Sequence, residues 1–227
     1  MRRIGFLFLF GLLQLTLSTN GAAFSPLKFF ASNSEPEIEF TEGKDYFSYQ
    51  EPLAIKPSDQ RILIQFFFDY DCRVCSYAQD ILTLYEQTNL DSVKLEVYPV
   101  ATEDLHYSAQ VFYTLKAINE EDTSALLLFE TAEKQRYTQL SKLNELRTWL
   151  AQQKVNVDTF NRAFYSLNVL REVWNAKKLT EDYGVFTFPY VVIDGRYVLT
   201  ASTLYSDDYS FAVLDFLVDK LIKEKQK

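Results

Sequence analysis

The sequence contains little cysteine, histidine or positive charge. Cys72 and Cys75 are the only cysteines and His106 is the only histidine among 227 residues. Two cysteines cannot build a framework of several disulfides. A closed zinc site needs about four ligands, at least two more than this pair supplies. We therefore expect no metal site, and we predict that His106 is a surface histidine at the start of a helix.

Positive charge is the second shortage. Acidic residues outnumber basic ones by 31 to 23, and the formal net charge is −8. Nucleic acids and anionic lipids bind basic patches, so this balance argues against both as partners. Hydrophobic residues make up 48% of the chain, with 19 phenylalanines and 15 tyrosines, which is typical of a folded protein rather than a disordered one.

The apolar stretch at residues 4–17 is shorter than the ~20 residues that a comfortable membrane span needs. It follows Arg2 and Arg3 and precedes the small residues 21–23, a pattern typical of a secretory signal peptide. We expect residues 1–23 to be cleaved on export, with an uncleaved anchor or a buried N-terminal helix as the alternative. No cysteine follows the stretch, which argues against lipoprotein attachment. Export would place the cysteines in an oxidising compartment, where a disulfide persists.

The two cysteines stand two residues apart at the end of an apolar run. The segment reads Phe66-Phe67-Phe68-Asp69-Tyr70-Asp71-Cys72-Arg73-Val74-Cys75. Such a pair is a redox dithiol, half of a metal site or a small structural staple. The shortage of further ligands disfavours the metal site, and a disulfide that closes so short a loop removes little entropy from the unfolded state. A redox dithiol is therefore the leading interpretation.

The hydrophobic pattern around the pair predicts a strand, a helix and a strand. Residues 62–68 form a nearly unbroken apolar run, as in a strand covered on both faces. Residues 93–98 alternate, as in a strand with one wet face. The helix between them is expected to end near residue 89 and to place the pair at the carboxyl end of the first strand, where open α/β sheets have their sites. Its inner face is predicted to comprise Val74, Ala78, Ile81 and Tyr85.

The remaining pattern is strand-rich at both ends and helical in the middle. A short first strand is expected around residues 46–49, and a final helix around residues 207–223. Asp194-Gly195 between two apolar runs predicts a two-residue hairpin. This order suggests one sheet domain with an inserted helical domain. The candidate helices of the insertion are 104–119, 123–135, 140–153 and a long or broken helix at 157–182.

A CxxC pair at a helix start has a chemical rationale. Unpaired N–H groups and the positive end of the helix dipole favour a thiolate at Cys72, lowering its pKa by roughly one to five units. The thiolate is the nucleophile in disulfide exchange, so we predict that Cys72 is the exposed attacking sulfur and Cys75 the deeper resolving one. Arg73 should lower the pKa of the Cys72 thiol further. Asp69 and Asp71 should oppose this, although Asp71 is also a candidate N-cap.

Phe188-Pro189 precedes a predicted strand. Proline cannot donate a hydrogen bond to a strand ladder. A cis X–Pro bond would suit the end of a loop whose exposed backbone pairs with an extended peptide. We therefore predict that Phe188 and Pro189 bind substrate beside the cysteines. An ordinary trans proline at a strand start is the alternative.

These segments together resemble the DsbA-like thiol:disulfide oxidoreductases of the thioredoxin-fold superfamily. The resemblance implies an α/β, thioredoxin-like fold with an inserted α-helical domain. Its parts would be residues 24–100 and 184–227 for the thioredoxin-like domain and 101–183 for the insertion. The matching pieces are Glu42-Gly43-Lys44-Asp45-Tyr46, the segment from Phe66 to Cys75, the helical insertion, Phe188-Pro189 and Val192-Ile193-Asp194-Gly195-Arg196-Tyr197.

The resemblance also implies roles. Cys72 and Cys75 would be the redox pair, and Pro189 the cis-proline that faces them. Phe188 would tune redox behaviour and partner choice. Arg73-Val74 stands where the best-known members carry Pro-His, so both residues are expected, with Asp71, to set the redox properties of the pair.

Two further positions depart from the best-known members. Phe66 stands where they carry a buried acid, and Val97 where they carry its lysine partner; Gln65 next door cannot accept a proton at neutral pH. A milder oxidant, an oxidase for few clients and a reductase-like role all stay open.

The predicted function is that of an exported, periplasmic oxidoreductase that introduces or exchanges disulfides in client proteins through Cys72 and Cys75. No metal and no bound cofactor are expected. The partners would be thiol-containing clients and, by resemblance, a quinone-linked membrane protein that re-oxidises the pair. The alternatives are a reductase or isomerase of the same fold, and a non-catalytic peptide-binding or chaperone-like module.

Overall fold

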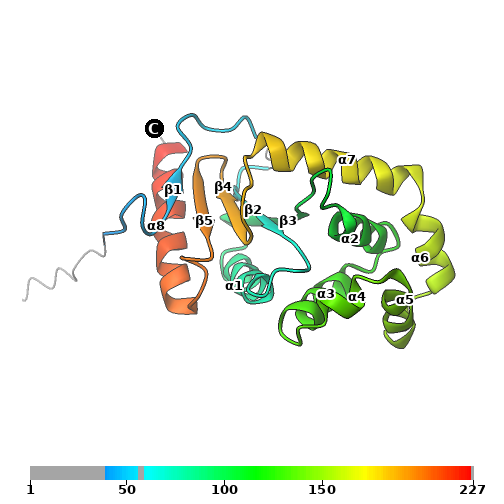
Figure 1. Ribbon diagram of the computed structural model, residues 1–227. Helices are drawn as coiled ribbons and strands as arrows, with labels where there is room; N and C mark the ends of the chain where they lie inside the picture. Colours follow the sequence, from blue (N-terminus) through cyan, green and yellow to red (C-terminus); the bar gives the residue numbers. More distant parts are fainter. Residues whose placement is uncertain (1–38, 56–58, 226–227) are drawn as a thin grey trace, which may run out of the picture. The chain divides into compact units, whose positions relative to one another are not determined.

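The structure is a computed structural model that describes residues 39–55 and 59–225. The expected signal peptide at residues 1–23 lies outside the described residues. The described part forms one five-stranded sheet in the order β1-β5-β4-β2-β3, with helices around it (Figure 1). The strands are β1 (Phe47–Ser48), β2 (Ile62–Phe68), β3 (Val93–Pro99), β4 (Tyr190–Ile193) and β5 (Tyr197–Thr200).

Eight helices are found in the described residues. No helix there is long and apolar enough to cross a membrane. The helices are α1 (Cys75–Thr88), α2 (Tyr107–Ala117), α3 (Glu121–Ala132), α4 (Tyr137–Leu140), α5 (Leu143–Gln152), α6 (Val157–Phe164), α7 (Leu167–Asp182) and α8 (Asp207–Lys225).

The predicted central strand is confirmed. Every residue of β2 is buried, and β2 pairs in parallel with β3 and antiparallel with β4. Because side chains alternate along a strand, Phe66 and Phe68 enter the larger hydrophobic cluster, whereas Phe67 enters the smaller cluster on the other face. Helices α1 and α8 and the inserted helices contribute to the larger cluster, and the end of α7 with residues 49–55 covers the smaller one.

The unit β2-α1-β3 places the cysteines as predicted, at the carboxyl end of the first strand. Helix α1, however, begins at Cys75, with Val74 as its N-cap residue. Val74 is 47% exposed, so its predicted place on the buried helix face is wrong. Because Val74 precedes the first helical residue, the helical period does not control its direction. The rest of the predicted face, Ala78, Ile81 and Tyr85, is buried.

The fold class is confirmed: a thioredoxin-like sheet with a helical insertion between β3 and β4. In Figure 1 the helices α2 to α6 gather on the right, and α7 runs back from them to the sheet. The helix predicted at 157–182 is broken, because Ser166 caps α7 by accepting the Val169 N–H at 3.3 Å. The short helix α4 was not predicted. The domain boundaries at 101 and 183 stay a prediction.

The predicted hairpin between β4 and β5 is present, but its loop is longer by one residue. Asp194 and Gly195 both have positive φ angles, 50° and 67°, and the Arg196 N–H donates to the Ile193 carbonyl at 2.9 Å. The register pairs Ile193 with Tyr197, so three residues separate the paired positions. The prediction of a two-residue loop is therefore wrong.

Contacts with the segment after β1 explain the loop. The Arg196 carbonyl accepts the Tyr49 N–H at 2.9 Å, which holds this extra residue against the neighbouring chain. A Cβ atom on Gly195 would lie 2.9 Å from the Leu53 carbonyl oxygen. The close approach and the positive φ together require glycine here.

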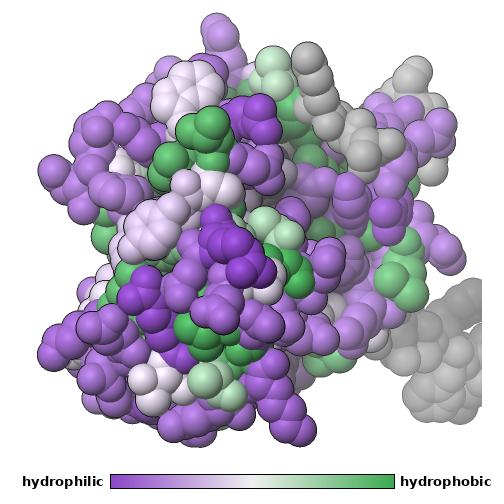
Figure 2. Space-filling view, turned by 90° about the vertical axis from the view of Figure 1, so that its right-hand side faces the viewer, coloured by the Kyte–Doolittle hydropathy of each residue, from purple (hydrophilic) through white to green (hydrophobic). Residues whose placement is uncertain are grey.

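The surface of the described part is mixed. Figure 2 shows the face that lies on the right in Figure 1: it is mostly hydrophilic, with apolar groups in small separate patches. Large apolar side chains are nevertheless exposed on α7, where Leu167, Leu170 and Trp174 are 85%, 47% and 61% exposed.

Candidate functional site

The cysteine pair occupies the turn between β2 and α1. Cys72 and Cys75 form a disulfide with a Cα–Cα distance of 5.4 Å. The Cys72 N–H donates to the Asp69 carbonyl at 3.1 Å, and the Cys75 N–H donates to the Cys72 carbonyl at 3.4 Å. Two successive turns thus carry the chain from the sheet into the helix and hold both sulfurs at the sheet's end.

Both cysteines are buried. Cys75 has no exposed surface and Cys72 has 3%, so the prediction of an exposed Cys72 is wrong. Asp71, Arg73 and Val74 are exposed around them. Both cysteines belong to the larger hydrophobic cluster. Cys72 is still the less covered of the two sulfur-bearing residues.

The N-terminal end of α1 has no side-chain cap and no acidic residue in its first turn. The candidate N-cap Asp71 is therefore wrong, because α1 begins four residues beyond it. The positive end of the helix dipole stays uncompensated by a carboxylate of the helix itself. A thiolate three residues ahead of the helix would be stabilised by this end.

Asp69 is fully buried directly after β2, which the sequence did not reveal. Its Oδ1 accepts the Asp71 N–H at 2.7 Å, while its Oδ2 has no hydrogen-bond partner. Burial raises the pKa of the Asp69 carboxyl. The available signal was its position: a short polar residue after a strand bonds its own backbone two residues on.

Tyr70 ties the turn to the inserted helices, another feature that the sequence did not reveal. Its N–H donates to Ser108 Oγ of α2 at 3.3 Å, and its hydroxyl lies 2.7 Å from Ser124 Oγ of α3. Tyr70 is 2% exposed, and burial raises the pKa of its hydroxyl. The only sequence signal was an aromatic residue with a polar tip between two acids.

Phe188 and Pro189 are joined by a cis peptide bond, so the trans alternative is wrong. Strand β4 runs antiparallel to β2 and pairs Tyr190 with Phe67. One step further along this register, Pro189 comes opposite Phe68, at the same end of the sheet as the turn to Cys72. Phe188 is partly buried against both hydrophobic clusters.

Phe186, four residues before Tyr190, is 83% exposed and was not singled out in the sequence. Its ring lies 5.8 Å from the ring of Tyr190, centroid to centroid. An exposed aromatic side chain on the loop before Phe188 is a surface on which an apolar group can pack.

The two departures from the best-known members lie side by side. Phe66 pairs with Val97 in the parallel register of β2 and β3, so both positions are apolar neighbours. Gln65 belongs to the opposite face of β2, where its Oε1 accepts the Tyr183 hydroxyl at 3.0 Å. None of these three side chains can exchange a proton with the pair at neutral pH.

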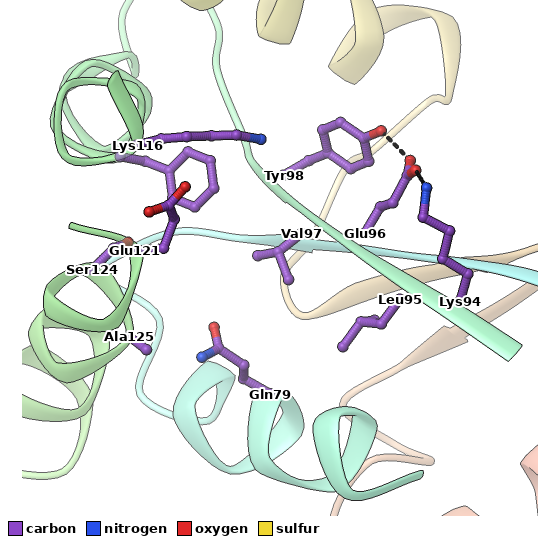
Figure 3. A pocket seen from close by; sticks show the side chains of 11 residues that line it. Gln79, Lys94, Leu95, Glu96, Val97, Tyr98, Lys116, Glu121, Ser124 and Ala125 are labelled. Atoms are coloured by element: carbon purple, nitrogen blue, oxygen red, sulfur yellow. Dashed lines mark hydrogen bonds and ion pairs between the residues drawn. The ribbon is translucent and has the colours of Figure 1, made fainter. Parts of the chain in front are cut away.

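A cavity of about 510 Å³ opens along the edge strand β3 (Figure 3), and neither cysteine is among its lining residues. Its wall carries the ion pair of Lys94 with Glu96 at 2.6 Å, and the Tyr98 hydroxyl donates to Glu96 at 2.6 Å. Burial raises the pKa of Glu96, but these two hydrogen bonds together with the positive charges of Lys94 and Lys116 outweigh it, and the net pKa is lowered. The other lining residues are Gln79, Leu95, Val97, Phe112, Lys116, Glu121, Ser124 and Ala125.

His106 is exposed at the N-cap position of α2, as predicted. Its Nδ1 lies 3.0 Å from the Glu103 carbonyl oxygen. Within residues 39–55 and 59–225, no cluster of three or more histidine, cysteine or acidic side chains is arranged to hold a metal ion.

Comparison with known proteins connects the chain to characterised relatives. No protein-family model matches it. An uncharacterised protein of Haemophilus influenzae is 54% identical over 195 residues, covering 86% of this chain and 83% of that protein. The thiol:disulfide interchange protein DsbA of Burkholderia cepacia is 26% identical over 185 residues, covering 81% and 86% of the two chains.

Solved structures agree on the fold. The crystal structure of Pseudomonas aeruginosa DsbA superposes with a TM-score of 0.71 and 21% identity, covering 83% of this chain and 97% of that one. A Neisseria meningitidis oxidoreductase of the same kind gives 0.68 and 18%, covering 82% and 96%. With its CxxC pair closed as a disulfide at the end of β2, the chain has the thioredoxin-like fold of the DsbA structures and is similar in sequence to DsbA thiol:disulfide interchange proteins.

Proposed function

We propose that the protein introduces or exchanges disulfides in client proteins through Cys72 and Cys75, after export from the cytoplasm. The observation that supports this most directly is the disulfide between the only two cysteines, in front of a helix end that carries no cap. Such a helix end stabilises a thiolate leaving group, and a disulfide with a stabilised leaving thiolate is an oxidant.

In the proposed reaction a client thiolate attacks Cys72 Sγ, and the Cys72–Cys75 bond breaks. Its electron pair leaves on Cys75, which takes up a proton. A second client thiolate then attacks the client sulfur of the mixed disulfide and releases Cys72. The client loses two electrons and two thiol protons and gains a disulfide. Cys72 is assigned the attacked position because it alone of the pair keeps exposed surface.

Phe188 and Pro189 are proposed to align the client. The register of β2 and β4 brings them to the end of the sheet that carries the pair. An extended client segment would pair with the backbone there, and the exposed ring of Phe186 would pack against client side chains. Backbone pairing and non-directional apolar contact depend little on the client side chains, so clients of many sequences could bind.

The exposed residues Asp71, Arg73 and Val74 are proposed to tune the pair. Arg73 favours the thiolate and Asp71 opposes it, and solvent screens both. The family relationship also suggests the periplasm as the compartment and a membrane partner that re-oxidises the pair. Thiol-containing proteins would be the clients, without metal, cofactor or nucleic acid.

A reductase or isomerase of the same fold is the second candidate. The observation that favours it is the apolar pair Phe66 and Val97, since buried ionisable groups at these positions are absent. A Cys72 thiol that titrates near the free-thiol value of about 8.5 would support this candidate over an oxidase.

Oxidation of a reduced, unfolded client such as ribonuclease A tests the proposal. The oxidised wild type should form client disulfides, and Cys72→Ser and Cys75→Ser should each lose this activity. Wild type whose reduced cysteines have been alkylated is the matched control, because its sequence is unchanged. A protein with both cysteines replaced by serine that keeps all biological activity would instead support a non-catalytic binding module.

A further inference from the structure

Asp69 is a buried ionisable group that the proposed exchange reaction does not yet use. It is 0% exposed, and its Oδ2 is the one buried side-chain oxygen or nitrogen in the described part of the chain without a hydrogen-bond partner. Buried polar atoms in folded proteins are nearly always paired, so an exception calls for an explanation. A redox or proton-handling role is one of the few explanations available.

The position of Asp69 connects it to the pair. Its carbonyl accepts the Cys72 N–H at 3.1 Å, which closes a turn whose two ends lie within about 7 Å of each other. Its Oδ1 accepts the Asp71 N–H at 2.7 Å inside the same turn. The carboxyl is thus held by the backbone that also holds the first cysteine.

Among the described residues, none of the groups that shift the pKa of Asp69 is a cation. Asp71 and Tyr70 flank it on the turn, and Tyr137 of α4 interacts with it electrostatically. Hydrogen bonding to the Asp71 N–H and to the Ser108 hydroxyl of α2 lowers the pKa of the Asp69 carboxyl, but burial outweighs it. Burial without a counter-ion favours the protonated carboxyl, and the raised pKa agrees with this.

We infer that Asp69 is a proton-holding residue that couples the redox state of the Cys72–Cys75 pair to pH. It acts on the pair by its charge and takes no part in the exchange of bonds, and it is therefore a positioning residue rather than a catalytic one. The inference rests on the proposed function, since it concerns the same cysteines.

The coupling is electrostatic. When a client reduces the disulfide, the S–S bond breaks and two electrons pass from the client to the two sulfurs. Cys75 takes up one proton and becomes a thiol, and Cys72 is left as a thiolate. A protonated Asp69 tolerates the negative charge on Cys72, whereas an ionised Asp69 repels it. The oxidising strength of the pair should therefore be greater below the pKa of Asp69 and fall as the pH rises through it.

The size of the effect follows from Coulomb's law. Two charges about 6 Å apart shift each other's pKa by roughly half a unit at a dielectric constant of 80 and by about two units at 20. Cys72 and Asp69 should then titrate as a coupled pair in the reduced protein, in two macroscopic steps.

The test titrates reduced wild type, Asp69→Asn and Asp45→Asn by thiolate absorbance. Asp45 is a matched control: it is also nearly fully buried, but both its oxygens accept hydrogen bonds, from Thr41 and Tyr209. It precedes β1, three strands away from β2 in the sheet. Wild type and Asp45→Asn should show two steps. Asp69→Asn should show one, with the upper part of the curve lowered by about half a unit to two units.

An infrared measurement keeps the inference testable if Asp69→Asn does not fold. The reduced-minus-oxidised spectrum of the wild type should contain a band of a protonated carboxyl that changes with the redox state and disappears as the pH rises. Identical titration curves for wild type and Asp69→Asn, or no such band, would overturn the inference.

The two failures are distinguishable. If Cys72 exchanges with glutathione but Asp69→Asn titrates as wild type, only the role of Asp69 falls. If Cys72 neither exchanges nor reacts with alkylating agents, the proposed function falls, and the inference about Asp69 falls with it.

Discussion

The hydrogen bond between Tyr70 and Ser124 gives the sharpest test of how the turn is anchored. Tyr70→Phe removes a hydroxyl that lies 2.7 Å from Ser124 Oγ in a fully buried setting. A net hydrogen bond contributes about 0.5–1.5 kcal/mol, and a partner left unsatisfied in the interior costs about 1–3 kcal/mol. Ser124 lies in α3 and can turn its hydroxyl to a carbonyl of the preceding turn, which limits the loss. We expect a loss of about 1–2 kcal/mol in the free energy of unfolding.

The double variant separates the energy of the hydrogen bond from the cost of leaving one buried hydroxyl without a partner. Tyr70→Phe with Ser124→Ala leaves no orphaned hydroxyl and should be less destabilised than the sum of the single variants, with a coupling of about 0.5–1.5 kcal/mol. Urea unfolding of all four proteins measures this, and the melting temperature of Tyr70→Phe should fall by about 2–8 °C. Additive effects of the two substitutions would refute the argument that this contact anchors the turn.

Three other predictions concern the pair and the core. Cys75→Ser should accumulate Cys72-linked mixed disulfides with clients, visible by mass spectrometry under non-reducing conditions; a protein recovered free of adducts would contradict the assigned roles. Phe67→Ala should lose about 3–5 kcal/mol in unfolding free energy, because the ring is fully buried among Tyr98, Tyr183 and Tyr190, and a loss under 1 kcal/mol would exclude this packing. Because the pKa of Asp69 is raised in the folded state, its contribution to stability is fully present below its unfolded-state pKa and is lost as the pH rises through its folded-state pKa. The free energy of unfolding of the wild type, measured with urea, should therefore fall over this pH range relative to that of Asp69→Asn. Parallel pH dependences of the two proteins would contradict this.

Much of the fold could be predicted because hydrophobic periodicity is a local property. The unbroken apolar run of β2 and the helical period after residue 104 predicted the central strand and the inserted helices. The strand-entering proline made a cis bond at Phe188-Pro189 one of two alternatives, and the family resemblance favoured it. Each of these patterns needs information from only a few neighbouring residues.

The features that were not predicted from the sequence depend on contacts between distant segments of the chain. The three-residue loop of the hairpin depends on the bond between Arg196 and Tyr49, which no local pattern shows. The burial of Cys72 and Asp69 depends on the surrounding helices, which cover a turn that is polar in sequence. Acidic residues are rarely buried, so no local pattern indicates that Asp69 is buried whereas Asp71 is exposed.

The start of α1 was also predicted wrongly, because the helix begins later than expected. Asp71 is an acceptable N-cap residue type, but the chain makes two turns before it becomes helical at Cys75. Cap preferences predict a start only to within a few residues. The late start also matters for the chemistry of the pair. The N-cap position of α1 carries no carboxylate, so none opposes a thiolate at Cys72 from that position.

Equilibration with glutathione tests the central claim most directly. The oxidised protein is incubated over a series of reduced-to-oxidised glutathione ratios, quenched with acid, and the states of Cys72 and Cys75 are counted by mass. We predict a reversible two-electron equilibrium between disulfide and dithiol, with a mixed disulfide on Cys72 as the intermediate. A pair that remains a disulfide at every ratio, with no glutathione attached to either sulfur, would contradict it.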